Sequence, residues 1–164
     1  MDTLNAEHEI PAIETSLSKA WEFLSGESRD FDHLTQWANL LRFTEFSFHM
    51  PMAGSRPDAR GGVGVLIEPS DAMTVAANMF GVPRQQVQQA DLRDACAEVC
   101  NVFADCVAPH FKTDPPVSVG LPRPGNPLTY AKLAEDTIIR VVYRGCKGGN
   151  TLFVVLYDSL SPSS

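Results

Sequence analysis

Three polar side chains on one predicted helix could act together in a reaction: Asp94, Glu98 and Asn101. At helical spacing, residues 91–111 place apolar side chains on one stripe and these three, together with Asp105, on the opposite stripe. We therefore predict one amphipathic helix of about five turns that ends at Pro109 or soon after it. Asn is a poor residue in mid-helix because its side chain competes for backbone groups. Asn101 is therefore the residue of this helix whose presence a function would best explain.

The spacing i, i+4, i+7 spreads these side chains over about 10 Å of one helix face. A carboxylate there can pair with a lysine of a partner protein. An amide both donates and accepts hydrogen bonds, so it can hold a water molecule in place. Phosphoryl transfer depends mainly on positioning and electrostatics, so a well-placed amide can accelerate it. A solvated helix face gives the same spacing, and the residues alone leave both interpretations open.

The cysteines offer a different site, a metal or redox centre. They are Cys96, Cys100, Cys106 and Cys146, and His110 follows the first three closely. On a helix Cys96 and Cys106 are about 15 Å apart, so one tetrahedral ion cannot bind both. The first three also point toward the apolar stripe, where a free thiol packs as a small apolar group. We expect core packing and no metal ligand.

The composition limits the class of partner. The chain has 164 residues, 44% of them hydrophobic and 20% charged, with a net charge of −7 and a pI near 5.0. This indicates a globular fold and argues against nucleic-acid and anionic-membrane surfaces. No signal peptide and no apolar run of about 20 residues is recognisable, so we expect a cytoplasmic protein without a membrane partner.

Helices and strands are both predicted in the first half of the chain. Residues 11–24 form a helix that Gly26 ends, and residues 27–42 suggest a second short helix through Phe31, Leu34, Trp37 and Leu41. Residues 43–52 and 62–68 alternate as two strands around a turn. A further helix begins with Ser70 as N-cap and closes at Gly81. Its predicted buried stripe is Ala72, Val75, Ala76, Met79 and Phe80.

The second half of the chain predicts strands after the long helix. Residues 116–121 form a short strand, and residues 121–127 form a turn-rich bend. Residues 137–144 and 151–157 form a hairpin around a Gly-rich loop. The fold class is therefore α+β, a largely antiparallel sheet with a long central helix and further helices packed on it. We predict a single domain over 11–158 with flexible tails at 1–10 and 159–164.

The pattern Asp94-x3-Glu98-x2-Asn101, followed after 22 residues by Pro124, resembles the signature of the CheC/CheX family of chemotaxis phosphatases. The surroundings also resemble CheX. A helix ending in Met79-Phe80-Gly81 precedes the pattern, and a strand leading into Leu121-Pro122 and a C-terminal hairpin follow it. The resemblance covers about residues 40–158, and Pro122 competes with Pro124 for the alignment.

The resemblance implies a function. The substrate would be the aspartyl phosphate of a CheY-like response regulator, and Mg²⁺ would belong to that receiver, with no cofactor on this chain. Glu98 would pair with the receiver's active-site lysine, and Asn101 would orient the attacking water. Asp94 would be accessory, and Pro124 would shape the loop beyond the strand. The resemblance also implies a homodimer formed through sheet edges.

The chain departs from the resemblance in several respects, since Phe103 follows Asn101 where family helices often have small residues, and residues 27–42 have no counterpart. Three further functions compete with the resemblance. CheC-type members carry the Glu-x2-Asn motif twice, whereas the helix over 70–80 has Asn78 but Val75 in place of the Glu. One site per chain fits the CheX type. A non-catalytic receiver-binding module would need Glu98 but not the Asn101 amide. A structural or dimerisation domain would bind no receiver, and a Cys/His metal protein would contain bound metal after purification.

Overall fold

The structure is a computed structural model, and it describes residues 10–34, 46–53, 60–110, 118–119, 123–125, 138–147 and 150–159. In chain order the elements are α1 (Ile10–Ser25), β1 (Phe31–Leu34), β2 (Phe46–Ala53), β3 (Arg60–Ile67), α2 (Pro69–Phe80), the short 3₁₀ turn η2 (Arg84–Gln86), α3 (Gln89–Val107), η3 (Ala108–His110), β4 (Ser118–Val119), β5 (Arg123–Gly125), β6 (Ile138–Lys147) and β7 (Asn150–Ser159). The predicted tails fall outside the described residues, except that Ile10 begins α1 and Ser159 ends β7.

The strands form one sheet of seven in the order β1-β6-β7-β3-β2-β4, with β5 also paired to β2. Every pairing between the described strands is antiparallel. The β2–β3 hairpin runs in register from Phe46 opposite Ile67 to Ala53 opposite Arg60. The β6–β7 hairpin closes with Lys147 opposite Asn150. The α+β prediction with a largely antiparallel sheet is therefore confirmed.

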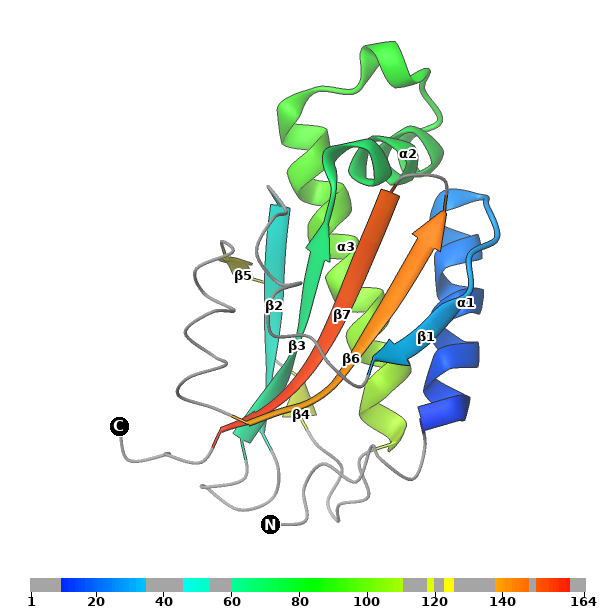
Figure 1. The fold of residues 1–164 in the computed structure, drawn as a ribbon. Coiled ribbons are helices and arrows are strands. Elements are labelled where there is room, and N and C mark those ends of the chain that lie inside the picture. The colour runs from blue at the N-terminus through cyan, green and yellow to red at the C-terminus, as the bar shows by residue number, and fades with distance from the viewer. Residues whose placement is uncertain are drawn as a thin grey trace.

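Helices α1 and α3 cover one face of the sheet and run in opposite directions, and α2 lies across one end (Figure 1). The side of the sheet that faces them is apolar because alternate residues of a strand share a face. From β3 and β7 it contributes Val63, Val65, Ile67, Leu152, Val154 and Leu156. The predicted stripe of α1 is buried against this face, and it consists of Ile13, Leu17, Trp21 and Leu24.

The helix ends follow local chain chemistry. Gly26 after α1 and Gly81 after α2 have positive φ angles of 77° and 64°, a conformation that costs glycine little. The start of α2 corrects the sequence analysis, because Glu68 is the N-cap residue and Ser70 lies inside the helix. Pro69 occupies the first turn, where its missing N–H removes no helical hydrogen bond.

Other boundaries also differ from prediction. The prediction of a short helix within 27–42 is wrong over Phe31–Leu34. These residues form the edge strand β1, which pairs with β6. Burial of Phe31 against the ring of Phe103 outweighs the helical spacing of Phe31 and Leu34, and the rest of that segment lies outside the described residues. The Gly-rich loop is shorter than predicted, since Gly145 and Cys146 belong to β6. The bend at 121–127 contains β5.

Candidate functional site

The long helix α3 positions the predicted site residues. A capping box starts it: the Gln88 side chain bonds the backbone of the first turn, and the Asp91 carboxylate accepts from the Gln88 N–H at 3.0 Å. The helix begins two residues earlier than predicted and gives way at Val107 to the 3₁₀ turn that contains Pro109. Its buried side consists of Leu92, Ala95, Cys96, Val99, Cys100, Phe103, Ala104 and Val107.

The opposite side of α3 carries the predicted polar stripe. Asp94 and Asp105 are exposed, whereas Glu98 and Asn101 between them are half-buried. The Asn101 Nδ2 group donates a hydrogen bond to Glu98 Oε1 at 3.3 Å. The bond uses one amide hydrogen and leaves the second hydrogen and the carbonyl oxygen for a ligand. Among the residues that the structure describes, Glu98 is the hydrogen-bond partner of this amide.

Two features of α3 leave the Asn101 amide accessible and set its electrostatic surroundings. Ala97, which is half-buried, lies four residues before Asn101, so this neighbouring position has no side chain beyond Cβ. Phe103, which follows Asn101 closely, points into the core and is fully buried. The helix carries Asp91, Asp94, Glu98 and Asp105 against the single basic residue Arg93. A partner that approaches this face therefore meets negative charge.

Pro124 lies on strand β5, opposite Phe48 of β2. We predicted that it shapes a loop, whereas the backbone there is a short strand. Strand β5 pairs with β2, and helix α3 also contacts β2. The three helical site residues share one face of α3. Pro122 lies outside the described residues.

The α3 cysteines lie on the inner side of the helix, as the apolar stripe predicts. Cys96 and Cys100 are buried, and burial raises the pKa of each thiol to about 12. Cys106 is half-buried, its Sγ is 3.7 Å from the Ser16 carbonyl oxygen, and burial raises its pKa as well. Cys146 is exposed on β6. Within the described ranges, no group of three His, Cys, Asp or Glu side chains could hold a metal ion.

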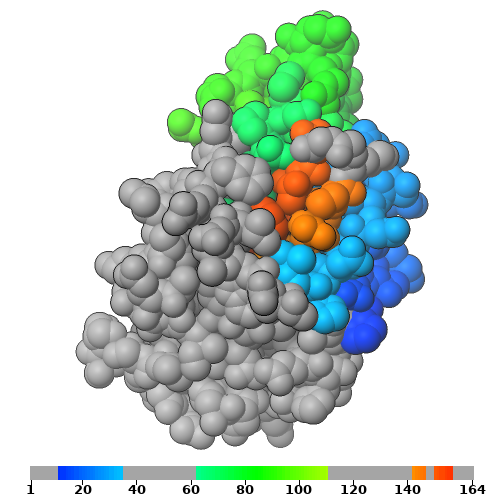
Figure 2. Space-filling model, viewed as in Figure 1, coloured from blue at the N-terminus to red at the C-terminus, as the bar shows by residue number. Residues whose placement is uncertain are grey.

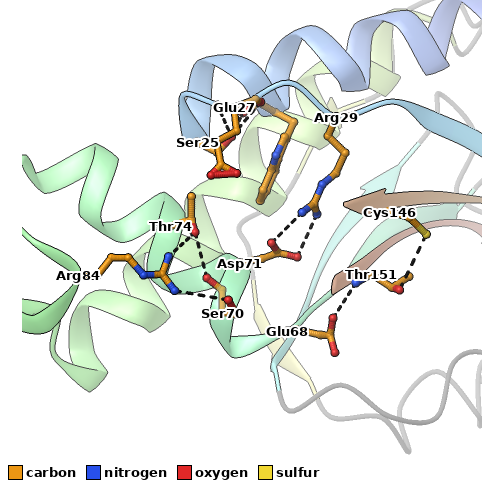
Figure 3. A network of polar contacts seen from close by, with 11 residues as sticks. Ser25, Glu27, Arg29, Glu68, Ser70, Asp71, Thr74, Arg84, Cys146 and Thr151 are labelled. Carbon is orange, nitrogen blue, oxygen red and sulfur yellow. Dashed lines mark hydrogen bonds and ion pairs between the residues drawn. The ribbon is translucent and has the colours of Figure 1, made fainter. Parts of the chain in front are cut away.

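A buried ion pair that the sequence analysis missed joins the segment between α1 and β1 to α2 (Figure 3). Arg29 donates to both carboxylate oxygens of Asp71 at 3.0 and 2.9 Å, and the two side chains are 2% and 5% exposed. The guanidinium carbon lies 4.7 Å from the centre of the Trp21 ring. A Cβ at Gly145 would come within 2.9 Å of the Arg29 side chain. No sequence signal links Arg29 with Asp71, because 42 residues separate them.

Among the residues that the structure describes, three large apolar side chains are exposed, and two of them contradict the sequence analysis. Phe23 is 78% exposed, Phe80 44% and Met79 38%. We predicted Met79 and Phe80 in the buried stripe of α2, but they lie in its last turn, past the part that packs on the core. Phe23 falls off the buried stripe of α1, which is a signal that the sequence itself carries.

The Glu98–Asn101 pair thus lies on the outer face of a helix that packs on an antiparallel sheet. Comparison with known proteins gives the fold a name. No family model matches the sequence, and no curated protein matches it.

Among the described helices, none combines the length and apolarity that a membrane span requires.

Solved structures do match. The CheX–CheY–BeF3–Mg²⁺ complex from Borrelia burgdorferi aligns with TM-score 0.67 and 12% identity, over 92% of this chain and 97% of that chain. CheX from Desulfovibrio desulfuricans aligns with TM-score 0.64 and 12% identity, over 93% and 99%. A FliM–SpeE complex from H. pylori aligns with TM-score 0.60 and 10% identity, over 96% and 88%. This chain therefore has the CheC/CheX-like fold, as the motif predicted.

Proposed function

We propose that this protein is a phosphatase that hydrolyses the aspartyl phosphate of a CheY-like receiver in chemotaxis or related two-component signalling. The Glu98–Asn101 pair carries the proposal: a half-exposed carboxylate and amide, 3.3 Å apart, on the outer face of α3 in a CheX-like fold. The similarity to a CheX solved together with CheY, BeF3 and Mg²⁺ supports a receiver as the partner.

In this proposal Glu98 docks the helix. Its carboxylate pairs with the receiver's active-site lysine and brings α3 over the phosphate. An acidic helix is electrostatically suited to a pocket that holds a lysine and a Mg²⁺ ion, because complementary charge guides the encounter and fixes the orientation. Asp94, one turn earlier and exposed, adds to that field as an accessory residue.

Asn101 positions the nucleophile. Its amide holds a water molecule in line with the phosphorus, and the small, half-buried neighbour Ala97 leaves room for close approach. The water oxygen forms a bond to phosphorus while the bond between phosphorus and the aspartyl oxygen breaks. The free aspartate carboxylate leaves, and a proton of the water passes to the phosphate. No covalent intermediate forms on this chain, and Mg²⁺ belongs to the receiver, so the chain needs no cofactor of its own.

The assembly is part of the proposal. We propose a cytoplasmic homodimer of a single domain over 11–158, in which Pro124 supports the receiver-facing surface through β5. The edge strand β1 favours a pairing partner, because in the described sheet it has a neighbour on one side alone.

The second candidate function is a non-catalytic module that binds a receiver or dimerises. The match to the FliM–SpeE complex favours this second candidate, because that complex combines a similar fold with another protein, SpeE. Such a module needs the acidic surface of α3 but gains nothing from an amide that positions water.

The test is the decay of phosphorylated CheY-like receivers from the same organism, measured with and without the native chain. We expect at least one receiver to lose its phosphate faster in the presence of the chain. The variant Glu98→Gln keeps the side-chain size but removes the charge, so it should raise the KM for that receiver. Asp105→Asn, an equal charge change on the same helix, is the control. Binding of receivers without faster decay would favour the second candidate.

A further inference from the structure

The exposed apolar side chains gather at one end of the molecule. We call Phe23, Met79 and Phe80 the apolar ledge; they are the exposed large apolar side chains among the residues described. Phe23 lies in the last turns of α1, and Met79 and Phe80 lie in the last turn of α2. In the space-filling view, the green part of the chain, which includes α2 and η2, forms a projection at one end of the molecule (Figure 2).

Hydrogen bonds hold the two helix ends together. The Asn78 Nδ2 group donates to the carbonyl oxygen of Leu24 at 2.8 Å and to that of Phe23 at 3.4 Å. A Cβ at Gly26 would lie 3.4 Å from Asn78 Oδ1, so the α1 terminus packs directly on this amide. The two helix ends that carry the ledge are therefore held against each other by hydrogen bonds.

The ledge lies beside the polar stripe of α3. Cys106 of α3 contacts Ser16 of α1 at 3.7 Å, and the two helices run in opposite directions (Figure 1). Seven residues are nearly two helical turns, so Phe23 lies on the same side of α1 as Ser16, about 10 Å further along. Seven residues back from Cys106 is Val99, the neighbour of Glu98. Phe23 and Glu98 thus occupy adjacent helices at about the same level.

Helix α2 contacts both α1 and α3. The acidic stripe of α3 and the helix ends that carry the ledge thus belong to three helices that pack on one another. Exposed aromatic and methionine side chains of this kind are typical anchors of protein interfaces.

We propose that the apolar ledge is the second half of the docking surface for the phosphorylated receiver. This inference rests on the proposed function and names the partner surface that it requires: an apolar patch next to the lysine-bearing phosphate pocket. Charge complementarity favours this occupant over a second copy of the chain, because a second copy would bring another acidic α3 against the first. The ledge supplies affinity and the Glu98–Asn101 pair supplies turnover.

The experiment separates those two contributions. A receiver from the same organism, phosphorylated with phosphoramidate, is bound and turned over by the native chain and by the double variant Phe23→Ser/Phe80→Ser. We expect Kd and KM to rise about tenfold with kcat within about twofold. Phe23→Leu keeps an apolar side chain and should retain most of the affinity. Thr15→Ser, at an exposed position elsewhere on α1, is the control, and circular dichroism verifies folding.

Each outcome decides a separate point. Unchanged Kd and KM in the folded double variant overturn the ledge as a receiver surface. A native dimer that becomes monomeric by sedimentation in the double variant, with receiver affinity intact, shows that a second copy covers the ledge instead. Binding without turnover that still weakens in the double variant removes the phosphatase assignment and keeps the docking one. A native chain that binds no phosphorylated receiver overturns both.

Discussion

Helices α2 and α3 each carry an asparagine that is not buried, yet the two amides have different surroundings. Asn78 of α2 donates to the carbonyl oxygens of Phe23 and Leu24, which belong to another helix. Asn101 of α3 donates to Glu98 of its own helix. Three residues before Asn78 stands Val75, which is fully buried, whereas Glu98, three residues before Asn101, is half-exposed.

The difference shows how one residue type is given two tasks. On α2 the amide completes the backbone hydrogen bonding of the α1 terminus, and a carboxylate at Val75 would lie inside the core. On α3 the amide and the carboxylate face outward, so both retain bonding capacity for a partner. Of these two helices, only α3 can therefore present a Glu-x2-Asn motif to a partner. Variants of either helix test this difference.

The largest effect is expected from completing the motif on α2. Val75→Glu would bury a charge without a partner, so we expect a loss of about 3 kcal/mol or more of unfolding free energy. It should add no receiver-phosphatase activity. Urea unfolding measures the stability, and Gln86→Glu, an exposed position with the same charge change, should stay within about 0.5 kcal/mol. A stable Val75→Glu variant with a second functional site would break the contrast between the helices.

The next effect concerns the ion pair that fixes the start of α2. Asp71→Asn leaves the buried Arg29 guanidinium without its counter-ion, and removal of one partner of a buried pair costs about 3 kcal/mol. We expect this loss in urea unfolding at pH 7, whereas Asp105→Asn on the exposed face of α3 should change little. The double variant Arg29→Met/Asp71→Leu should recover part of the loss, and a double variant no more stable than Asp71→Asn would argue against charge burial as the cause.

The inner face of α3 is predicted to make stability depend on pH. Burial raises the pKa of Cys96 and of Cys100 from 9.0 to about 12, so the folded state keeps both protons where the unfolded state loses them. The folded state thus binds more protons between about pH 9 and 12, and stability falls as pH rises. The slope is at most about 1.4 kcal/mol per pH unit for each thiol. Urea unfolding of Cys96→Ala/Cys100→Ala should give a flatter profile, and equal slopes would contradict the buried placement.

The smallest effect compares the two amides directly. Asn78→Ala removes hydrogen bonds to two backbone carbonyl oxygens and should cost about 1 kcal/mol of stability, with kcat unchanged. Asn101→Ala removes a bond within one partly exposed helix surface and should change stability by less than about 0.5 kcal/mol. Thermal unfolding of the two variants side by side measures this difference, and equal losses would mean that both amides are structural.

The sequence predicts the elements whose signal is local. The stripe of α1, the alternation of β2 and β3, the glycine ends of both early helices and the polar stripe of α3 follow from period and capping chemistry. What it missed depends on contacts between distant residues. Phe31 forms a strand because β6 pairs with it, and Met79 and Phe80 are exposed because the core ends before the last turn of α2. No local pattern pairs Arg29 with Asp71.

The candidate site follows the same division. The spacing of Asp94, Glu98 and Asn101 predicts a shared face, which the structure shows, since a helix fixes that relation by itself. Pro124 is separated from them by residues outside the described chain, and its place on β5 depends on pairing with β2. The apolar ledge needs the ends of two helices to be brought together, so the sequence could indicate only that Phe23 lies off the buried stripe.

The most direct test of the account is single-turnover decay of a phosphorylated receiver at saturating concentrations of the native chain and of Asn101→Ala. Removal of one group that positions or stabilises the reacting centre typically costs about 100-fold or more in rate. We expect the variant to lose acceleration on that scale while its Kd for the phosphorylated receiver stays within about threefold. An Asn101→Ala variant that accelerates decay as the native chain does would contradict the catalytic role of this amide.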